Sequence, residues 1–467
     1  MRSKFHIWTL TVACLVAGSA VISGAPGGVA ITNSTADGNP PSGERLKFQM
    51  DTLVGDYGRV GKHNAKWDAP AKEALTDFAG ILAAPTAATA RQKEEMLIAL
   101  KAAVAKGCDD PMIRYMQARF LGNSGEQTPV QTAAKLQDAA VVLEQSQYAA
   151  VRKHLAALRA AEALNIGQTK TPPEVHTWRK KALRYLKDSI NERSMPVEEA
   201  SVMTEDLLKA VKTNGRELEE FYKELEPVLF KNWSNEAQIY LIKGIYYLDF
   251  AWQARGTGYA NTVTEEGWRL FAQRVVEAEK ALDQAWKLNP RDGRTAKNML
   301  RLELGQGKGR ARMEIWFKRA TDLNPNDYFP FQAKLNYLEP KWYGSEKEML
   351  DFARECVAPG KWGAYAAPAL VDAHDRLVRY LPPAQYNDYW KRPEVWQDVK
   401  KAFDKYLSAF PDDETRRQSY VVHAWRAEKW DEVNRHVPYL KHVDYQVFGG
   451  KKAFDEMVEY AKSEQRE

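Results

Sequence analysis

One helical segment occurs twice in this chain, 35 residues apart, and it constrains the fold more than any other feature of the sequence. The two copies are Ala278-x-x-x-Leu282-x-x-Ala285-x-x-Leu288-Asn289-Pro290 and Met313-x-x-x-Phe317-x-x-Ala320-x-x-Leu323-Asn324-Pro325. In each copy the apolar residues recur at helical spacing, and a proline stops the helix where the chain must turn. Small residues let two helices approach closely, and the large residue fills the space between them. The sequence therefore predicts paired helices that repeat along the chain.

This pattern resembles the second helix of a tetratricopeptide repeat, whose period is about 34 residues. The resemblance is good over about 235–345 and fair over 383–440, where a weaker third copy ends at Pro411. Over 68–230 it rests on helix pairing alone. It implies a tetratricopeptide-like solenoid of helical hairpins, which presents a curved, concave surface.

Amphipathic segments separated by short Gly, Pro, Asn or Asp breaks fill the rest of the chain from about Asp68. Clear examples are Arg91–Lys106, Val130–Gln145, Val151–Leu164, Glu174–Asn191 and Val197–Lys212. No run of alternating β-branched residues indicates a strand. We therefore expect an all-α fold of about eighteen helices and no sheet, with an N-terminal helical array over 67–230 and a tetratricopeptide-like repeat array over 231–467.

The N-terminus has the parts of a secretory signal peptide. Arg2 and Lys4 precede an apolar run over 7–22, and small residues follow it, so we expect a cleaved leader over 1–30. The run of about 16 residues is shorter than the roughly 20 that span a membrane. The prediction is a periplasmic or extracellular protein with no stable membrane insertion after cleavage. Residues 31–66 are polar and rich in Gly and Pro, which predicts a flexible linker.

Two short stretches also resemble exported bacterial proteins of tetratricopeptide type. They are Leu338–Ser345 and Gly107–Pro111. This resemblance agrees with the leader and implies a helical-repeat fold, but it implies no particular activity.

Charge and cysteine content exclude several classes of protein. Removing Arg2 and Lys4 lowers the formal net charge from +5 to about +3, and the basic residues alternate with acids instead of forming a stripe. A nucleic-acid binder is therefore not expected. The mature chain keeps only Cys108 and Cys356, far apart in sequence, which excludes a disulfide framework and predicts two separately buried thiols.

No motif for catalysis, metal or cofactor binding stands out. The histidines are scattered, without His-Glu-x-x-His or a Cys-x-x-Cys partner, and Gly-x-Ser-x-Gly is absent. The glycine-rich stretch 305–309 lacks the Lys-Ser/Thr ending of a phosphate loop and is expected to be a helix-to-helix turn. We therefore expect no catalytic residue, no metal and no cofactor, and predict that the protein is not an enzyme.

An enzyme of another class remains the alternative. Exported, tryptophan-rich helical chains include α/α-barrel glycoside hydrolases and polysaccharide lyases, which need two acids facing each other across a sugar cleft. Two pairs of acids in the sequence bear on this alternative, Asp372 with Asp375 and Asp412 with Asp413. The second pair is typical of a helix start after a proline, where acids suit the helix dipole. Asp372 and Asp375 lie one helical turn apart, and we expect both to face solvent.

One segment departs from the repeat pattern and marks the candidate binding site. Residues 256–264 are too long for the turn of about three residues inside a tetratricopeptide hairpin. Insertions in solenoids often lie on the binding face. The aromatic and cationic residues around this insertion are the candidate ligand-binding residues: Trp252, Arg255, Tyr259 and Trp268. The prediction is a scaffold that binds a protein or peptide partner in a concave groove, with a glycan as the alternative ligand.

Overall fold

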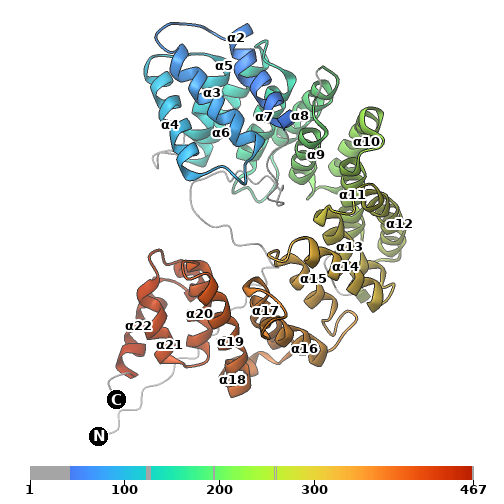
Figure 1. Cartoon of the computed structure of the whole chain (residues 1–467), viewed down its shortest axis with the longest axis vertical. Helices are drawn as coiled ribbons and strands as arrows, with labels where there is room; N and C mark the ends of the chain where they lie inside the picture. Colours follow the sequence, from blue (N-terminus) through green and yellow to red (C-terminus); the bar gives the residue numbers. More distant parts are fainter. Residues whose placement is uncertain (1–42, 122–127, 193–194, 257, 259, 465–467) are drawn as a thin grey trace.

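The helices of this protein stack in chain order into an open crescent (Figure 1). The computed structural model describes residues 43–121, 128–192, 195–256, 258 and 260–464. Within these ranges every regular element is a helix and there is no strand. The predicted all-α solenoid is therefore confirmed.

The N-terminal half of the crescent consists of helices α1 to α10. Their bounds are α1 Gly43–Met50, the π-helical η1 Asp51–Gly55, α2 Asp56–Val60, α3 Asp68–Ala83, α4 Ala90–Ala105, α5 Pro111–Phe120, α6 Pro129–Glu144, α7 Ala150–Asn165, α8 Pro173–Glu192, α9 Val197–Val211 and α10 Gly215–Trp233. The bounds expected from the sequence for α4 and α6 to α9 agree with these to within one or two residues. Hydrophobic periodicity and capping residues thus located the helices correctly.

The C-terminal half consists of helices α11 to α22 and several short 3-10 segments. The bounds are α11 Ala237–Arg255, η2 Ala260–Thr262, α12 Glu265–Leu288, α13 Gly293–Gln306, α14 Arg310–Leu323, α15 Phe329–Tyr337, α16 Glu346–Val357, η3 Ala364–Ala366, α17 Pro368–Leu377, η4 Val378–Tyr380, η5 Pro383–Gln385, α18 Tyr386–Lys391, α19 Pro393–Ala409, α20 Glu414–Arg426, α21 Trp430–His436, η6 Val437–Tyr439, η7 Tyr445–Phe448 and α22 Lys451–Glu464. The described part thus has more helices than the eighteen expected, in part because Pro368, Pro383 and Pro393 begin new segments.

Consecutive helices pack as hairpins, and the hairpins lie side by side. The tightest pairs are α3 with α4, α7 with α8, and α11 with α12. In the middle of the crescent α9, α11, α15 and α17 lie on its inner side, whereas α10, α12 and α16 lie on its outer side (Figure 1). A closed α/α-barrel needs its first and last hairpins to pack together. In the described part the substantial contacts all join helices close in chain order, so the α/α-barrel alternative is wrong.

The small residues of the repeat motif form the contact inside the α11–α12 hairpin. Ala278, Ala281 and Ala285 of α12 are buried, and Gly244 of α11 packs against Leu282. Two separate core clusters then meet on α11. Its side chains Tyr246 and Phe250, among others, join the core of the N-terminal half, and Leu241 and Leu248 join the core of the C-terminal half. This helix therefore connects the two halves.

The prediction of a flexible linker over 31–66 is wrong for residues 43–60, which form the continuous helix α1–η1–α2. Its buried face repeats at helical spacing: Arg45, Phe48, Gln49, Thr52, Leu53, Asp56 and Tyr57. Arg45 pairs with Glu199 of α9. Residues 31–42 and the predicted signal peptide 1–30 lie outside the described residues.

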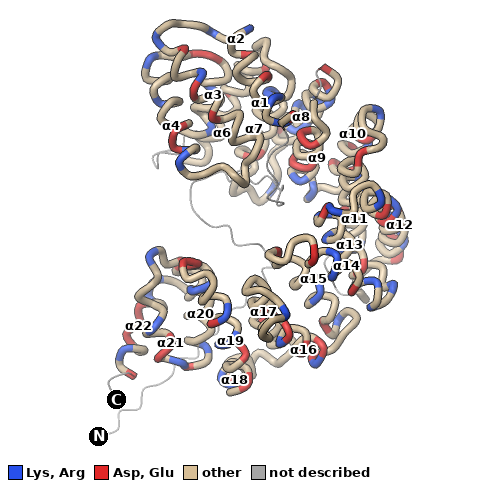
Figure 2. Tube along the Cα trace, viewed as in Figure 1, with Lys and Arg blue, Asp and Glu red and all other residues tan. Residues whose placement is uncertain are grey.

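Three other features agree with or add to the expectations. Cys108 and Cys356 are both buried and free, as predicted, and burial raises the pKa of these thiols to about 11 and about 12. Basic and acidic residues are interspersed along the crescent (Figure 2). None of the described helices combines the length and apolar character that crossing a bilayer requires.

Candidate functional site

A cleft of about 380 Å³ lies where the two halves meet, between helices α9, α11 and α13. Its lining residues are Glu205, Leu208, Lys209, Lys212, Leu218, Ile242, Ile245, Tyr246, Asp249, Arg294, Lys297, Asn298, Arg301 and Phe329. Clefts of this size with an apolar lining and a few converging polar groups are the usual form of binding sites. None of the lining residues lies on α12, the outer helix of the central hairpin.

The floor of the cleft is apolar and comes mainly from α11. Ile242, Ile245 and Tyr246 lie on one face of this helix, at spacings of three and four residues. Leu208 of α9 and Phe329 of α15 extend this apolar surface on its two sides. Ile242 and Tyr246 are buried and Ile245 is half-buried, so the floor is formed by side chains that also hold the core together.

Two layers of ion pairs cross the cleft above this floor. Arg294 of α13 pairs with Glu205 of α9, so the two helices approach each other across α11. Further along, the carboxylate of Asp249 accepts from Lys212 at 2.8 Å and from Arg301 at 2.5 Å. Burial would raise the pKa of Asp249, but Arg301 and Lys212 outweigh this effect and lower it. Asp249 therefore stays ionised between two cations from opposite sides.

Between these two layers the cleft carries two lysines. Lys209 is exposed and makes no ion pair within the described part of the chain. Lys297 pairs with Asp327, which precedes α15, at 2.8 Å. At this level α11 supplies Ile245 and no carboxylate. Cations thus outnumber acids among the lining residues, and of these cations Lys209 is the one without an ion pair in the described part of the chain.

Three of the four residues predicted as the binding site do come together, around Arg255. Its guanidinium carbon lies 5.6 Å from the ring centre of Trp252, 5.3 Å from Trp268 and 5.2 Å from Trp342. Arg255 is 9% exposed, and it donates to the carbonyls of Gly256 and Gly258 at 3.2 and 3.1 Å. This cluster, called the arginine cage below, therefore already contains its cation and holds the start of the insertion.

The arginine cage lies beside the cleft, at the edge where each inner helix turns into its outer partner. Trp252 is one turn beyond Asp249 on α11. Gly305, near the end of α13, lies at the same edge. It packs against α12 so closely that a β-carbon on it would come within 2.8 Å of Phe271. The expected helix-to-helix turn over 305–309 is confirmed, since α13 ends at Gln306 and α14 begins at Arg310. Tyr259, the fourth predicted residue, lies outside the described residues.

The acids Asp372 and Asp375 have protein partners, which differs from the expectation that they face solvent. Tyr328 donates to Asp372 at 2.5 Å, and burial raises the pKa of this carboxyl. Burial would also raise the pKa of Asp375, but His423, 3.4 Å away, and Arg426 lower it overall. Neither acid lines the cleft.

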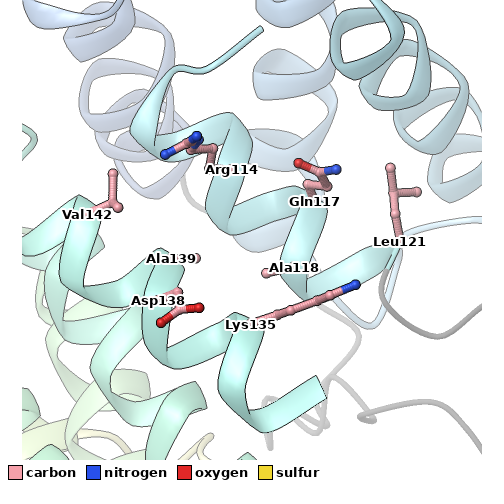
Figure 3. Close-up of a pocket in the computed structure, with 8 residues that line it drawn as sticks. All are labelled: Arg114, Gln117, Ala118, Leu121, Lys135, Asp138, Ala139 and Val142. Carbon is pink, nitrogen blue, oxygen red and sulfur yellow. The ribbon is translucent and has the colours of Figure 1, made fainter. Parts of the chain in front are cut away.

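A second depression of about 510 Å³ lies in the N-terminal half, between α5 and α6 (Figure 3). Its floor is Ala118 and Ala139, whose small side chains leave space between the two helices. The exposed Arg114, Gln117 and Asp138 border it. Its other apolar lining residues are Leu121 and Val142. Among the described residues, no group of three or more His, Cys, Asp or Glu side chains is placed to hold a metal ion.

The cleft residues were not among those predicted from the sequence. A signal for them was present: Arg294, Lys297 and Arg301 recur at three and four residues and so share one face of a helix. On a helix that also needs apolar residues for its core, such a basic face can indicate a functional surface. The pairing of this face with Lys209 and Lys212 depends on the packing of hairpins that are far apart in sequence.

No protein-family model matches this chain, and no curated protein matches it. Solved structures with a similar course of helices include a monomeric mutant of IFIT1 with m7Gppp-AAAA, at 10% identity and a TM-score of 0.28, covering 86% of this chain and 95% of that one. The human IFIT1 dimer with m7Gppp-AAAA has 11% identity and a TM-score of 0.26, covering 91% and 96%. The APC/C hetero-tetramer Cut9-Hcn1 has 11% identity and a TM-score of 0.24, covering 90% and 87%. At these TM-scores, nothing known of those proteins is transferred to this chain.

Proposed function

We propose that this protein is an exported helical-repeat scaffold that binds a protein partner through the cleft on the inner side of the crescent. The observation that carries this proposal is the cleft itself, in which an apolar floor on α11 lies between charged walls on α9 and α13. Extended inner surfaces of this kind are what solenoids use for binding. Export is supported by the basic residues Arg2 and Lys4 followed by the apolar run over 7–22.

The composition of the cleft favours a protein segment as the ligand. Burying an apolar side chain of the ligand contributes about 1.5–3 kcal/mol, and the floor offers the half-buried Ile245 and Phe329 for such contacts. Protein interfaces place a desolvated apolar centre inside a polar rim. The walls of this cleft supply that rim.

Site-directed photo-crosslinking from two positions tests the proposal. A photoreactive amino acid replaces Ile245 in the floor of the cleft, or Val276 on α12, which is 48% exposed and outside the cleft. Both variants are expressed in the native source, and the crosslinked species are identified by mass spectrometry.

The proposal expects a discrete protein partner at position 245 and none at position 276. Introducing Ile245→Asp into a protein whose crosslinker replaces the half-buried Phe329, also in the lining of the cleft, should abolish the capture. Equal capture from both positions, or capture that survives Ile245→Asp, would mean that the cleft is not the binding surface.

A further inference from the structure

We infer that the cleft takes an acidic segment of its partner, in which carboxylate side chains alternate with apolar ones. This inference rests on the proposed function, because it specifies the ligand of the same site. The observation behind this inference is the order of charged and apolar residues along α9, α11 and α13.

Three levels can be distinguished along the cleft, each one helical turn from the next. At the first level Glu205 of α9 pairs with Arg294 of α13. At the third, Lys212, Asp249 and Arg301 form a bridge across α11. Both outer levels thus contain their own carboxylate.

At the middle level α11 supplies no carboxylate, and the acid present there is Asp327, which pairs with Lys297 at 2.8 Å. Lys209 precedes Lys212 by three residues and Lys297 precedes Arg301 by four, so each lysine lies one turn away from the bridge. Both line the cleft, and the residue that α11 places between them is Ile245, one turn before Asp249. The middle level therefore has a cation on each wall, as the third level does. On α11 it has the apolar Ile245 where the third level has Asp249.

Asp249 shows the geometry that these walls impose on a carboxylate. Its two oxygens accept from opposite sides, at 2.8 Å from Lys212 and 2.5 Å from Arg301. A carboxylate from a ligand lying over Ile245 would meet Lys209 on one side and, on the other, Lys297, which also pairs with Asp327. Lys209 has no ion-pair partner within the described part, so it can bind a ligand carboxylate and no existing ion pair has to break.

The apolar floor determines the rest of the pattern. Side chains of an extended segment alternate between two sides, so one set reaches the floor of the cleft while the next set points toward its rim. Exposed charge pairs contribute only about 0.2–1 kcal/mol each. The apolar contacts therefore provide most of the affinity, and the lysines determine which segment is chosen.

A nucleic acid is a poorer fit for this surface. Single-stranded RNA is bound by stacking bases on exposed aromatic rings above a basic groove. The aromatic residues lining the cleft are Tyr246, which is 4% exposed and packs in the core, and the half-buried Phe329. An acidic protein segment uses both the floor and the cations, whereas a phosphate backbone would use only the cations.

Matched peptides test the inference on the full chain. Three labelled peptides of about twelve residues, roughly 40 Å when extended, alternate Leu with Glu, with Gln or with Lys. A single-stranded RNA of similar length is the fourth probe, and binding is measured by fluorescence anisotropy.

The Leu-Glu peptide should bind about tenfold more tightly than the Leu-Gln peptide, and the Leu-Lys peptide more weakly than both. Raising the salt concentration from about 0.05 to about 0.5 M should weaken the binding of the Leu-Glu peptide and of no other peptide. Equal binding of the three peptides, binding by none of them, or tighter binding of the RNA would each overturn the inference.

Charge-reversal variants locate the effect. Lys209→Glu should weaken the binding of the Leu-Glu peptide about five- to tenfold and leave the binding of the Leu-Gln peptide unchanged. Lys401→Glu makes the same charge change on an exposed lysine of α19, far from the cleft, and should change neither. Identical losses in both variants would show a general charge effect and overturn the inference.

These outcomes are separable from those of the proposed function. Crosslinking from Ile245 captures a partner of any charge. If a partner is captured at position 245 but the peptides show no preference for acidic residues, the inference of an acidic ligand is wrong and the proposed binding cleft stands. If no partner is captured at position 245, both the inference and the proposed function are wrong.

Discussion

Gly244 lies so close to Leu282 that a β-carbon on the glycine would come within 2.6 Å of the leucine Cγ. Real β-carbons essentially never show such a contact, so the Leu282 side chain or the two helices have to move if the glycine is replaced. Gly244→Ala should therefore lower the free energy of unfolding by about 1–3 kcal/mol, as overpacking does in other cores. Urea unfolding followed by circular dichroism measures the change.

The control for that substitution is Gly80→Ala in α3, where a β-carbon would meet no atom within 4 Å. Since alanine is the better helix former, this variant should be neutral or more stable by up to about 1 kcal/mol. If both alanines have the same effect, close packing at Gly244 is not what holds the hairpin together.

The arginine cage predicts a local effect at the insertion. Arg255→Met removes the cation from three tryptophan rings and two donors from the carbonyls of Gly256 and Gly258. Cation–π contacts contribute about 0.5–2 kcal/mol, so the variant should lose about 1–3 kcal/mol. Cleavage by thermolysin within 256–264 should become faster, and the tryptophan emission should change.

An exposed arginine of α12 provides the comparison for Arg255. Arg269→Met removes a cation whose partner, Glu266, is one turn away on the surface, and it should cost at most about 1 kcal/mol. Slower or unchanged cleavage in Arg255→Met would show that the cage does not hold the insertion.

The helix over 43–60 predicts that the N-terminal part of the chain contributes to stability. Arg45 and Glu199 form an ion pair at 2.6 Å with side chains only 7% and 4% exposed. Glu199→Gln removes the charge of the carboxylate that faces the buried Arg45 and should cost about 3–5 kcal/mol, read from the denaturant midpoint. Asp51→Asn, which removes the exposed partner of Arg59, should cost at most about 1 kcal/mol. A neutral Glu199→Gln would mean that this helix is as dispensable as a linker.

Asp206 predicts a dependence of stability on pH. Burial raises the pKa of this carboxyl to about 6, although Arg159 lies 3.8 Å away and opposes the shift. Because the folded pKa lies above the unfolded value of 3.8, ionised Asp206 destabilises the fold above about pH 6. This penalty decreases as the pH falls from 6 and disappears below 3.8.

Replacing Asp206 with asparagine should therefore stabilise the protein near neutral pH. Asp206→Asn is expected to gain about 1–3 kcal/mol at about pH 7.5, and this gain should shrink by about 1 kcal/mol at about pH 5. Unfolding of both proteins at the two pH values measures it. If the gain in unfolding free energy is the same at both pH values, the ionisation of Asp206 is not its cause.

The sequence predicted the helices well because their signals are local. The apolar spacing in Val197–Lys212 and the proline after Leu288 are visible within one or two turns of the chain. Ser345 likewise caps α16, where its side chain accepts from the backbone of Glu348. Wherever the determinant of structure lies inside the element, the prediction was close.

The helix over 43–60 was missed because its determinants lie far away in sequence. Its buried face is largely polar, and Gln49 and Thr52 bond to Arg152, more than ninety residues later. Read alone, that face looks like the surface of a linker. Trp342 was absent from the predicted site for the same reason, since it reaches Arg255 only after two further hairpins have packed.

The two cores that meet on α11 have a mechanical consequence. In a solenoid each hairpin contacts only its neighbours, so a change of curvature must occur between adjacent hairpins. The cleft lies at such a position, with its walls on α9 and α13 and its floor on α11. Opening or closing the crescent at this point would change the width of the cleft. A ligand that contacts all three helices would therefore fix the bend of the whole molecule, and with it the distance between the two ends.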